Sequence, residues 1–447
     1  MARTIVRAAA AFGLVVACAA VSTAAGPVAR AAVTEGDWPT YHLNNLRDGY
    51  QSRLDPLSTL SVDWNAALDG AVYGQPLVVG GRIFAATEND TVYALNRSTG
   101  AVLWSAHLGS PEPLSALPCG DIGPLGITST MVYDPGTNRL FTVAELLGGT
   151  HTLVGVNADT GTVEMQVPIE PPLGDAIAYQ QRAALTLLNG RIYVPYGGLF
   201  GDCGNYIGQV VSVTTAGSDP QSYAVPTARE AGIWGPGGGV VDGSGNLLYA
   251  SGNGAAVSGT YDGSDSVIKL SPALQRLDFF APSDWATQNG GDADLGSMTP
   301  ALVGQYVYED GKTGNGYVLQ ANALGGVGGQ VGELANTCET FGAAAVVGNT
   351  VYLPCVTGPQ AVTISSAGTP TQLWKSIVPA EGSPVVGGGA VWTMDYNGGE
   401  LYALDPATGA TKAQIQIGRA PNFASPTLVG DQVFVGTLNG VVAVGGA

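Results

Sequence analysis

Apolar and polar residues alternate along most of the chain with a period of two. The stretch TVYALNRSTGAVLWSAHLG, which begins at Thr91, contains an apolar strand, an Asn, a Thr-Gly step and a second strand. This period predicts strands with one buried face and one exposed face. The Thr-Gly step supplies the positive-φ residue that a tight hairpin needs, so the stretch predicts two antiparallel strands.

The same plan recurs until the chain holds eight such units. Clear copies begin at His151 and Gly399, and weaker copies begin at Gly208, Ser266, Gly316, Ala361 and Asn439. Partner strands such as PLVVGGRIFAAT and PTLVGDQVFVGT lie between the copies and form further hairpins. Eight units over roughly 400 residues match the ~40–50 residues of a four-stranded propeller blade.

The two ends of this array of repeats complement each other. The last unit stops after VVAVGG, and the stretch LSVDWNAALDG, residues 60–70, precedes the first unit. Sharing one blade between both ends closes a ring and leaves only short, protected strand edges. We therefore predict an all-β fold, a single eight-bladed β-propeller over residues 59–447 closed by pairing of its N- and C-terminal strands. A solenoid of the same repeats is the alternative, which this complementarity disfavours.

Composition agrees with a large folded domain and excludes one class of partner. The 447 residues are 45% apolar and 12% charged, and 66 Gly and 27 Pro punctuate the short apolar runs. Disordered chains are polar and poor in aromatic residues, so disorder is disfavoured. The net charge of −18 argues against nucleic acid as a partner, because phosphate binding needs a basic patch. We expect a monomer.

The N-terminal residues resemble an export signal. Arg3 and Arg7 precede an Ala- and Val-rich run, which ends in small residues at 29–31. This predicts a cleaved signal peptide over 1–31, a short N-terminal segment over 32–58 and a secreted or extracytoplasmic protein. Lipidation at Cys18, which would anchor the chain to a membrane, is the alternative. No later apolar run is long enough to cross a bilayer.

Four cysteines remain after the signal peptide: Cys119, Cys203, Cys338 and Cys355. Export and an even count favour two disulfides, for which three pairings exist. We expect Cys119–Cys203 and Cys338–Cys355, because the second pair flanks an expected hairpin. No CxxCH motif for covalent haem attachment occurs.

The repeat YALxxxTGxxxW is similar to the tryptophan-docking repeat of the quinoprotein family, which binds pyrroloquinoline quinone (PQQ). The stretch DWPTYHLNNLRDGYQ, residues 37–51, also resembles the N-terminal segment of that family. The resemblance covers nearly all of the mature chain and implies the propeller fold. The same repeats also build non-catalytic scaffolds, so function has to be argued from the site.

The middle of the chain carries a more specific resemblance, to quinoprotein alcohol dehydrogenases. In GIWGPGGGVVDGSGNLLYASGNG, Trp234 falls on the family's cofactor-stacking position and Asn253 on a calcium-ligand position. The motif DADLGS places Asp294 on the catalytic base, which also contacts the ion, and GKTGNGYVL places Lys312 on the lysine that contacts the quinone. These matches occur in family order. The DLGS form is most similar to the polyvinyl-alcohol dehydrogenase branch and its secreted relatives.

The chemistry that this resemblance implies suits these residue types. PQQ is a flat quinone with three carboxylates, and an indole face offers stacking area at low entropic cost. Ca²⁺ takes hard oxygen ligands, which Asn and Asp provide. A carboxylate takes the alcohol proton as hydride leaves for the quinone, and Lys312 stabilises the reduced quinone's oxygen.

The chain also departs from the family pattern. The calcium-binding Glu is expected near GGLFGDCGNYIGQVV, where the nearest carboxylate is Asp202. The vicinal disulfide of many members is missing, and Cys119–Cys203 is its candidate replacement. Arg182 in QQRAAL is a candidate partner for a PQQ carboxylate.

Two functions follow from these observations. The first is an exported PQQ- and calcium-dependent dehydrogenase that oxidises a small or polymeric alcohol. The second is a non-catalytic propeller that binds a protein or polymer on its face. Each candidate residue also has a structural explanation: Trp234 as core, Asn253 as a turn residue, and Asp294 and Lys312 as solvated charges. The enzyme hypothesis requires that these four side chains converge near the central axis on one face.

Overall fold

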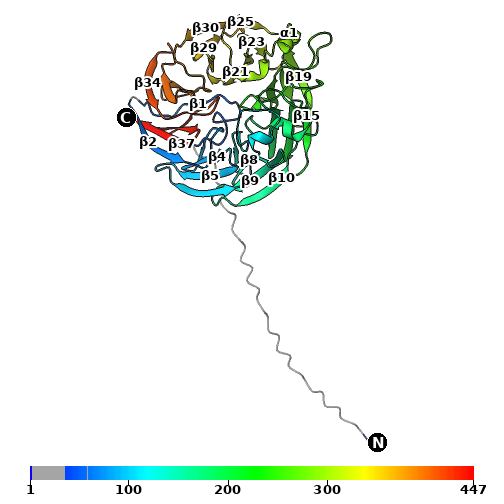
Figure 1. The fold of residues 1–447 in the computed structure, drawn as a ribbon, viewed down its shortest axis with the longest axis vertical. Helices are drawn as coiled ribbons and strands as arrows, with labels where there is room; N and C mark the ends of the chain where they lie inside the picture. The colour runs from blue at the N-terminus through cyan, green and yellow to red at the C-terminus, as the bar shows by residue number, and fades with distance from the viewer. Residues whose placement is uncertain (3–35, 58, 447) are drawn as a thin grey trace.

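The computed structural model of the protein describes residues 1–2, 36–57 and 59–446. Its strands form eight sheets of four or five strands, arranged around a ring (Figure 1), and a short two-stranded pairing. The predicted eight-bladed β-propeller is therefore confirmed. The predicted signal peptide over 1–31 and the alternative lipidation site at Cys18 lie outside the described residues. No helix among the described residues is long and apolar enough to cross a membrane.

The first four sheets follow the chain from residue 77 to residue 281. The first contains β3 (Leu77–Val79), β4 (Arg82–Thr87), β5 (Thr91–Asn96) and β6 (Val102–His107). The second contains β7 (Val132–Asp134), β8 (Arg139–Leu146), β9 (Thr150–Asn157) and β10 (Val163–Pro168). The third contains β11 (Tyr179–Gln180), β12 (Thr186–Leu188), β13 (Arg191–Gly198), β14 (Gln209–Thr214) and β15 (Gln221–Ala224). The fourth contains β16 (Val240–Val241), β17 (Leu247–Ser251), β18 (Ser266–Leu270), β19 (Arg276–Ala281) and β24 (Gly326–Val327).

The other four sheets complete the ring. The fifth contains β21 (Ala301–Val303), β22 (Tyr306–Glu309), β23 (Asn315–Gln320) and β25 (Gly332–Ala335). The sixth contains β27 (Ala345–Val347), β28 (Thr350–Leu353), β29 (Gln360–Ile364) and β30 (Pro370–Lys375). The seventh contains β1 (Tyr50–Gln51), β31 (Val385–Gly387), β32 (Ala390–Asp395), β33 (Glu400–Leu404) and β34 (Thr411–Gln416). The eighth contains β35 (Thr427–Val429), β36 (Gln432–Thr437), β37 (Gly440–Gly446) and β2 (Leu60–Ala67).

Shorter elements lie in the connections between the sheets. They are η1 (Leu114–Ala116), η2 (Ala176–Ala178), α1 (Trp285–Gly290), η3 (Leu295–Ser297), and the pair β20 (Met298–Thr299) and β26 (Gly342–Ala343).

Burial along the strands follows their position in each blade. Strands such as β17 and β4 are buried at nearly every residue, because neighbouring blades cover both faces of the sheet. Outer strands such as β34 alternate between exposed and half-buried residues. The period-two alternation of the sequence therefore comes chiefly from outer strands, while the apolar runs are the inner strands.

Three tryptophans each dock one blade onto the next at a Thr-Gly turn. The indole nitrogen of Trp104 in β6 donates to the carbonyl of Ala158, 3.2 Å away, in the next blade. The ring covers Gly161, where a Cβ atom would lie 2.7 Å from the indole. The pairs that share this arrangement are Trp64 with Gly100, Trp104 with Gly161, and Trp374 with Gly409. The Thr-Gly step thus serves both the hairpin and the contact between blades.

The eighth blade joins the two ends of the chain, as the sequence predicts. Strand β2 pairs antiparallel with β37 from Leu60 opposite Gly446 to Ala67 opposite Gly440. The two strands lie side by side in Figure 1. The missing outer strand of the last repeat therefore comes from residues before the first repeat.

Residues 37–51, here called the crossing segment, run across the ring and contact the innermost strands of six blades. Trp38 pairs with Val78, and the carbonyl of Asn45 accepts from the backbone of Val241 at 2.8 Å. The inner-strand residues bonded to the segment are Val78, Tyr133, Leu187, Val241, Val346 and Val386. Several of these residues lie next to the turn that follows the innermost strand, so the crossing segment covers the channel near that end.

Both predicted disulfides form. Cys119 pairs with Cys203 and Cys338 with Cys355, with Cα–Cα distances of 5.9 Å and 5.6 Å. The first joins two loops, and the second joins the ends of a segment that contains a β-hairpin.

Candidate functional site

Strand order places the four predicted site residues on one face of the ring. In an antiparallel blade built from the inside outward, the turn after the second strand lies on the same face as the connection to the next blade. We call this the loop face. Asn253 and Lys312 lie in such turns, after β17 and β22. Trp234 and Asp294 lie in such connections, before β16 and β21.

Asp294 lies at the centre of this group and is buried, with 4% of its surface exposed. Its Oδ1 accepts a hydrogen bond from the backbone N–H of Asn253 at 2.7 Å. Its Oδ2 lies 2.6 Å from the ammonium of Lys312. Burial raises the pKa of Asp294, and Lys312 and the N–H of Asn253 oppose the rise without cancelling it.

Lys312 is held at Asp294 by its backbone as well as by its charge. Its N–H donates to the carbonyl of Asp294 at 3.0 Å, and its Nζ lies 3.1 Å from Oδ1 of Asp292. Burial lowers the pKa of Lys312, but the two carboxylates outweigh it, so the net pKa is raised. Lys312 and Asp294 therefore form a partly buried ion pair rather than two solvated charges.

Trp234 lies beside this pair and belongs to none of the apolar core clusters of the described residues. Its ring packs against Gly197 and Gly232, where a Cβ atom would lie 2.8 Å from the side chain. A Cβ on Gly252 would collide with Asp294 Oδ1 and lie 3.5 Å from the indole nitrogen. Glycine at these positions therefore lets the indole, the backbone at Gly252 and the carboxylate approach closely.

A line of aromatic rings leads from Trp234 across the ring to Arg182. The Trp234 and Phe341 centroids are 6.3 Å apart, and Phe341 stacks on Phe423 at 5.7 Å with parallel planes. The Arg182 guanidinium lies 4.7 Å from the Phe423 centroid and 5.6 Å from that of Tyr73. The stacked cation and rings offer flat faces that suit a planar ligand.

Arg182 is a buried cation that forms no ion pair among the described residues, although Glu88 and Asp121 act on its charge from a distance. Its guanidinium donates to the carbonyl of Asn422 at 2.8 Å, and its buried Nε has no partner. Within the described part of the chain, no carboxylate forms an ion pair with it. The residue borders a cavity lined by Tyr41, Tyr73, Gln75, Thr128, Thr130, Arg182, Pro236, Asn422, Phe423 and Ser425. Tyr41 belongs to the crossing segment, so the cavity lies on the axis of the ring.

Asp202 lies in the same neighbourhood but is otherwise engaged. Its Oδ1 accepts a hydrogen bond from the hydroxyl of Tyr206, and its backbone carbonyl accepts one from the guanidinium of Arg229 at 2.6 Å. The sequence analysis missed Glu230, whose carboxylate lies 3.1 Å from Arg229. Burial raises the pKa of Glu230, Arg229 opposes this, and the nearby charges of Asp202 and Asp294 raise it further. Glu230 therefore lies near both Asp202 and Asp294 and interacts with them electrostatically.

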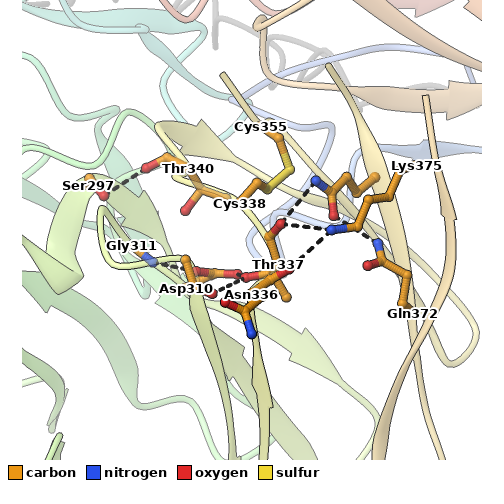
Figure 2. Close-up of a disulfide and its surroundings, with 12 residues drawn as sticks. Ser297, Asp310, Gly311, Asn336, Thr337, Cys338, Thr340, Cys355, Gln372 and Lys375 are labelled. Atoms are coloured by element: carbon orange, nitrogen blue, oxygen red, sulfur yellow. Dashed lines mark hydrogen bonds between the residues drawn. A yellow bond between two sulfur atoms is a disulfide. The ribbon is translucent and has the colours of Figure 1, made fainter. Parts of the chain in front are cut away.

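The Cys338–Cys355 disulfide anchors the loops that carry Lys312 and Phe341 (Figure 2). Thr337 donates to Asp310 Oδ2 at 2.6 Å, and the N–H of Thr340 donates to the carbonyl of Gly311 at 3.2 Å. On the other side, Ser297 donates to the carbonyl of Thr340 at 2.7 Å. These bonds join the three loops that carry Asp294, Lys312 and Phe341 into one unit.

Phe423 and Glu230, neither of which was predicted from the sequence, have an unusual backbone conformation but no sequence motif. Phe423 and Glu230 adopt φ of 64° and 68°, in the left-handed region that non-glycine residues seldom occupy. Such strain clusters at functional sites because the surrounding structure must maintain it. The sequences around these residues, PNFAS and AREAG, contain no motif that predicts this backbone conformation.

The residue types present suit the flat, anionic part of PQQ, although the cavity beside Arg182 has a volume of only about 10 Å³, and the carboxylates do not suit calcium. Trp234 and Phe423 supply aromatic faces, and Arg182 supplies a cation that forms no ion pair among the described residues. The predicted calcium donors Asn253, Asp294 and Asp202 do not form one set of ligands, because a lysine and a tyrosine already bind the two carboxylates. Among the described residues, no three His, Cys, Asp or Glu side chains are arranged to hold a metal ion.

Comparison with known sequences agrees with the repeats. A PQQ-repeat family model, described as outer membrane protein assembly factor BamB, matches residues 57–241. A polyvinylalcohol dehydrogenase of Sphingopyxis sp. (strain 113P3) is 26% identical over 281 residues, which are 56% of this chain and 39% of that protein. The matched region therefore spans about two fifths of the relative's length.

Comparison with solved structures concerns the fold. The europium-containing methanol dehydrogenase superposes with a TM-score of 0.71 at 14% identity, covering 93% of this chain and 98% of that one. The quinohemoprotein alcohol dehydrogenase of Comamonas testosteroni superposes with a TM-score of 0.69 at 15% identity, covering 93% and 81%. The repeats and these superpositions show the eight-bladed propeller fold, and residues 57–241 match the PQQ-repeat family model.

Proposed function

We propose that the protein is a PQQ-dependent dehydrogenase of an extracytoplasmic compartment, which oxidises an alcohol by hydride transfer to the quinone. One observation carries the proposal: Trp234, Asp294 and Lys312 meet on the loop face, and a line of aromatic rings joins them to Arg182. The resemblance of the DLGS motif to polyvinyl-alcohol dehydrogenases, and the relative of that name, point to a small or polymeric alcohol. The two disulfides support an oxidising compartment.

In this proposal each residue has one task. Trp234 and Phe423 bind the planar ring system, and Arg182 pairs with one of its carboxylates. PQQ, when bound, accepts the hydride from the alcohol carbon. Asp294 accepts the hydroxyl proton as the C–H bond breaks, and its raised pKa brings its basicity closer to that of a working general base. Lys312 keeps Asp294 oriented and places positive charge where the reduced ring gains negative charge.

Binding can be tested before activity. Purified mature protein is titrated with PQQ, and quenching of tryptophan fluorescence is followed. We expect saturable quenching that is lost in Trp234→Phe and retained in the control Trp104→Phe, a tryptophan that docks two blades far from the site. A dye-linked screen of alcohols follows, in which Asp294→Asn lowers the rate by at least about 100-fold. A folded protein that shows no quenching at tens of micromolar PQQ would refute the proposal.

The second candidate is a non-catalytic propeller that binds a protein or polymer on its loop face. Two observations favour it: the family match described as an outer-membrane assembly factor, and exposed apolar side chains in turns and connections of the loop face. These side chains are Leu114, Leu147, Leu173 and Phe200. Phe200 is 72% exposed. Failure of PQQ binding would turn attention to this surface.

A further inference from the structure

Each carboxylate near Trp234 already has a hydrogen-bond or ion-pair partner within the protein. Both oxygens of Asp294 are engaged, one by the Asn253 N–H at 2.7 Å and one by the Lys312 ammonium at 2.6 Å. Asp292 shares the same ammonium at 3.1 Å. One lysine thus serves two carboxylates, and one of them, Asp294, is the residue that the family resemblance implies as an ion ligand.

The two neighbouring acids are engaged in the same way. Glu230 pairs with Arg229 at 3.1 Å, and Asp202 accepts the hydroxyl of Tyr206. A calcium ion needs six to eight oxygens at about 2.3–2.6 Å from one point. Among the described residues Asp292 and Asp294 both contact the Lys312 ammonium, so a divalent ion that used these carboxylates would have to displace the ammonium or share them with a like charge.

The loop that carries Lys312 holds it at this position. The backbone N–H of Lys312 bonds to the carbonyl of Asp294, and the neighbouring Gly311 accepts from Thr340. Gly311 also donates to Asp310, which Thr337 contacts beside the Cys338–Cys355 disulfide. These contacts fix the position of the loop from which the Lys312 side chain reaches Asp294, and Figure 2 shows those made by Gly311 and Thr337.

We propose that the Lys312 ammonium, and not a divalent metal ion, is the resident cation of this site. The role of this cation, to orient Asp294 and to offset charge on a reduced quinone, rests on the proposed function. The central claim, that the site rejects metal because Lys312 occupies it, does not depend on quinone binding.

The metal experiment uses Tb³⁺, a luminescent probe of calcium sites, on the full mature chain without quinone. Light absorbed by Trp234 would excite an ion bound beside it. We expect no saturable luminescence from the wild-type chain below about 100 μM. Lys312→Gln releases Asp292 and Asp294, and we expect it to bind Tb³⁺ at least about tenfold more tightly, with Trp234→Phe in the same background removing the signal.

The matched control is Lys269→Gln. Lys269 also forms a partly buried ion pair, with Asp242 at 2.6 Å, but lies in β18 away from Trp234. This variant should gain no luminescence. Circular dichroism confirms folding, and Lys312→Met, which also removes the charge, replaces the glutamine variant if that fails to fold. Wild-type Tb³⁺ binding that Asp294→Asn abolishes, or no gain in either Lys312 variant, would overturn the proposal.

The quinone experiment separates this inference from the proposed function. PQQ quenching is measured in EDTA and in excess Ca²⁺, and we expect the same affinity within about threefold. Quinone binding that requires Ca²⁺ would overturn the inference and leave the proposed function standing. No quinone binding, together with metal rejection by the wild type and metal binding by Lys312→Gln, would refute the proposed function and support the inference.

Discussion

Arg47 in the crossing segment offers a sharp test of how the channel is closed. The side chain is 3% exposed, and no ion pair with a carboxylate is found for it among the described residues. Its guanidinium donates to four neutral oxygens, at 2.6 Å to Thr40, 2.9 Å to Tyr41, 3.0 Å to Leu185 and 2.9 Å to Thr186. Burial lowers the pKa of Arg47 to about 10, which shows that burying the charge has a cost.

The expected effect of Arg47→Met is the balance of these two terms. Hydrogen bonds to a charged group contribute about 1.5–3 kcal/mol each, so four of them contribute roughly 6–12 kcal/mol. Removing the buried cation recovers several kcal/mol of its desolvation cost. The carbonyls of Tyr41 and Leu185 stay buried and lose a donor, whereas the two hydroxyls can turn to other partners. We expect a net destabilisation of about 3 kcal/mol.

Differential scanning calorimetry at one fixed scan rate measures the change. With an unfolding entropy of ~2.1 cal/mol/K per residue over about 400 residues, 3 kcal/mol lowers the midpoint by about 3–4 °C. The control is Arg139→Met, which removes a partly exposed ion pair to Glu164 and should shift the midpoint by less than about 1 °C. Equal midpoints for the two variants would show that the crossing segment does not hold the inner strands together.

Three further predictions concern stability. Burial raises the pKa of Glu88 to about 8 and that of Asp90 to about 9, and, although burial opposes it, two glutamates raise the pKa of His151 to about 9. These groups bind protons more tightly in the folded than in the unfolded state, so the protein should be more stable near pH 6 than at pH 9. Asp90→Asn should make the thermal midpoint depend less on pH. The double variant Cys338→Ser, Cys355→Ser removes a disulfide that joins residues 17 positions apart, and should lower the free energy of unfolding by about 3 kcal/mol. Denaturant unfolding would measure this change, and an unchanged transition would contradict the prediction. Gly161→Ala, at φ 74° and with its new Cβ 2.7 Å from Trp104, should cost about 1–3 kcal/mol in the same assay, whereas Gly190→Ala, with open space around it, should cost less.

The repeats could be predicted from sequence because each is a local feature. Alternation over six residues and a Thr-Gly step specify a hairpin without reference to the rest of the chain. Closure through residues 60–70 was also predictable, since a missing strand at one end matched a surplus strand at the other. Both disulfides followed from an even count and from the hairpin expected between Cys338 and Cys355.

The site could be predicted only where a motif marks it. Asp294 and Lys312 were identified by resemblance, and the structure brings their side chains together. The stack of Phe341 on Phe423 joins two loops from different blades, and only the closed ring fixes their distance. Glu230 was missed because its carboxylate reaches the site from a connection that no motif covers.

Joining β2 and β37 in one blade has a consequence for the time course of folding. Residues 60 and 446, which pair in the finished protein, are separated by 386 positions in the chain. At a synthesis rate of about 5–20 residues per second, β2 waits roughly 20–80 s for its partner to emerge. Seven blades can form before that moment, but the last pairing has a very long contact order and is slow to nucleate. A circular permutant that opens the chain between two other blades would make this blade contiguous, and should close sooner after synthesis ends.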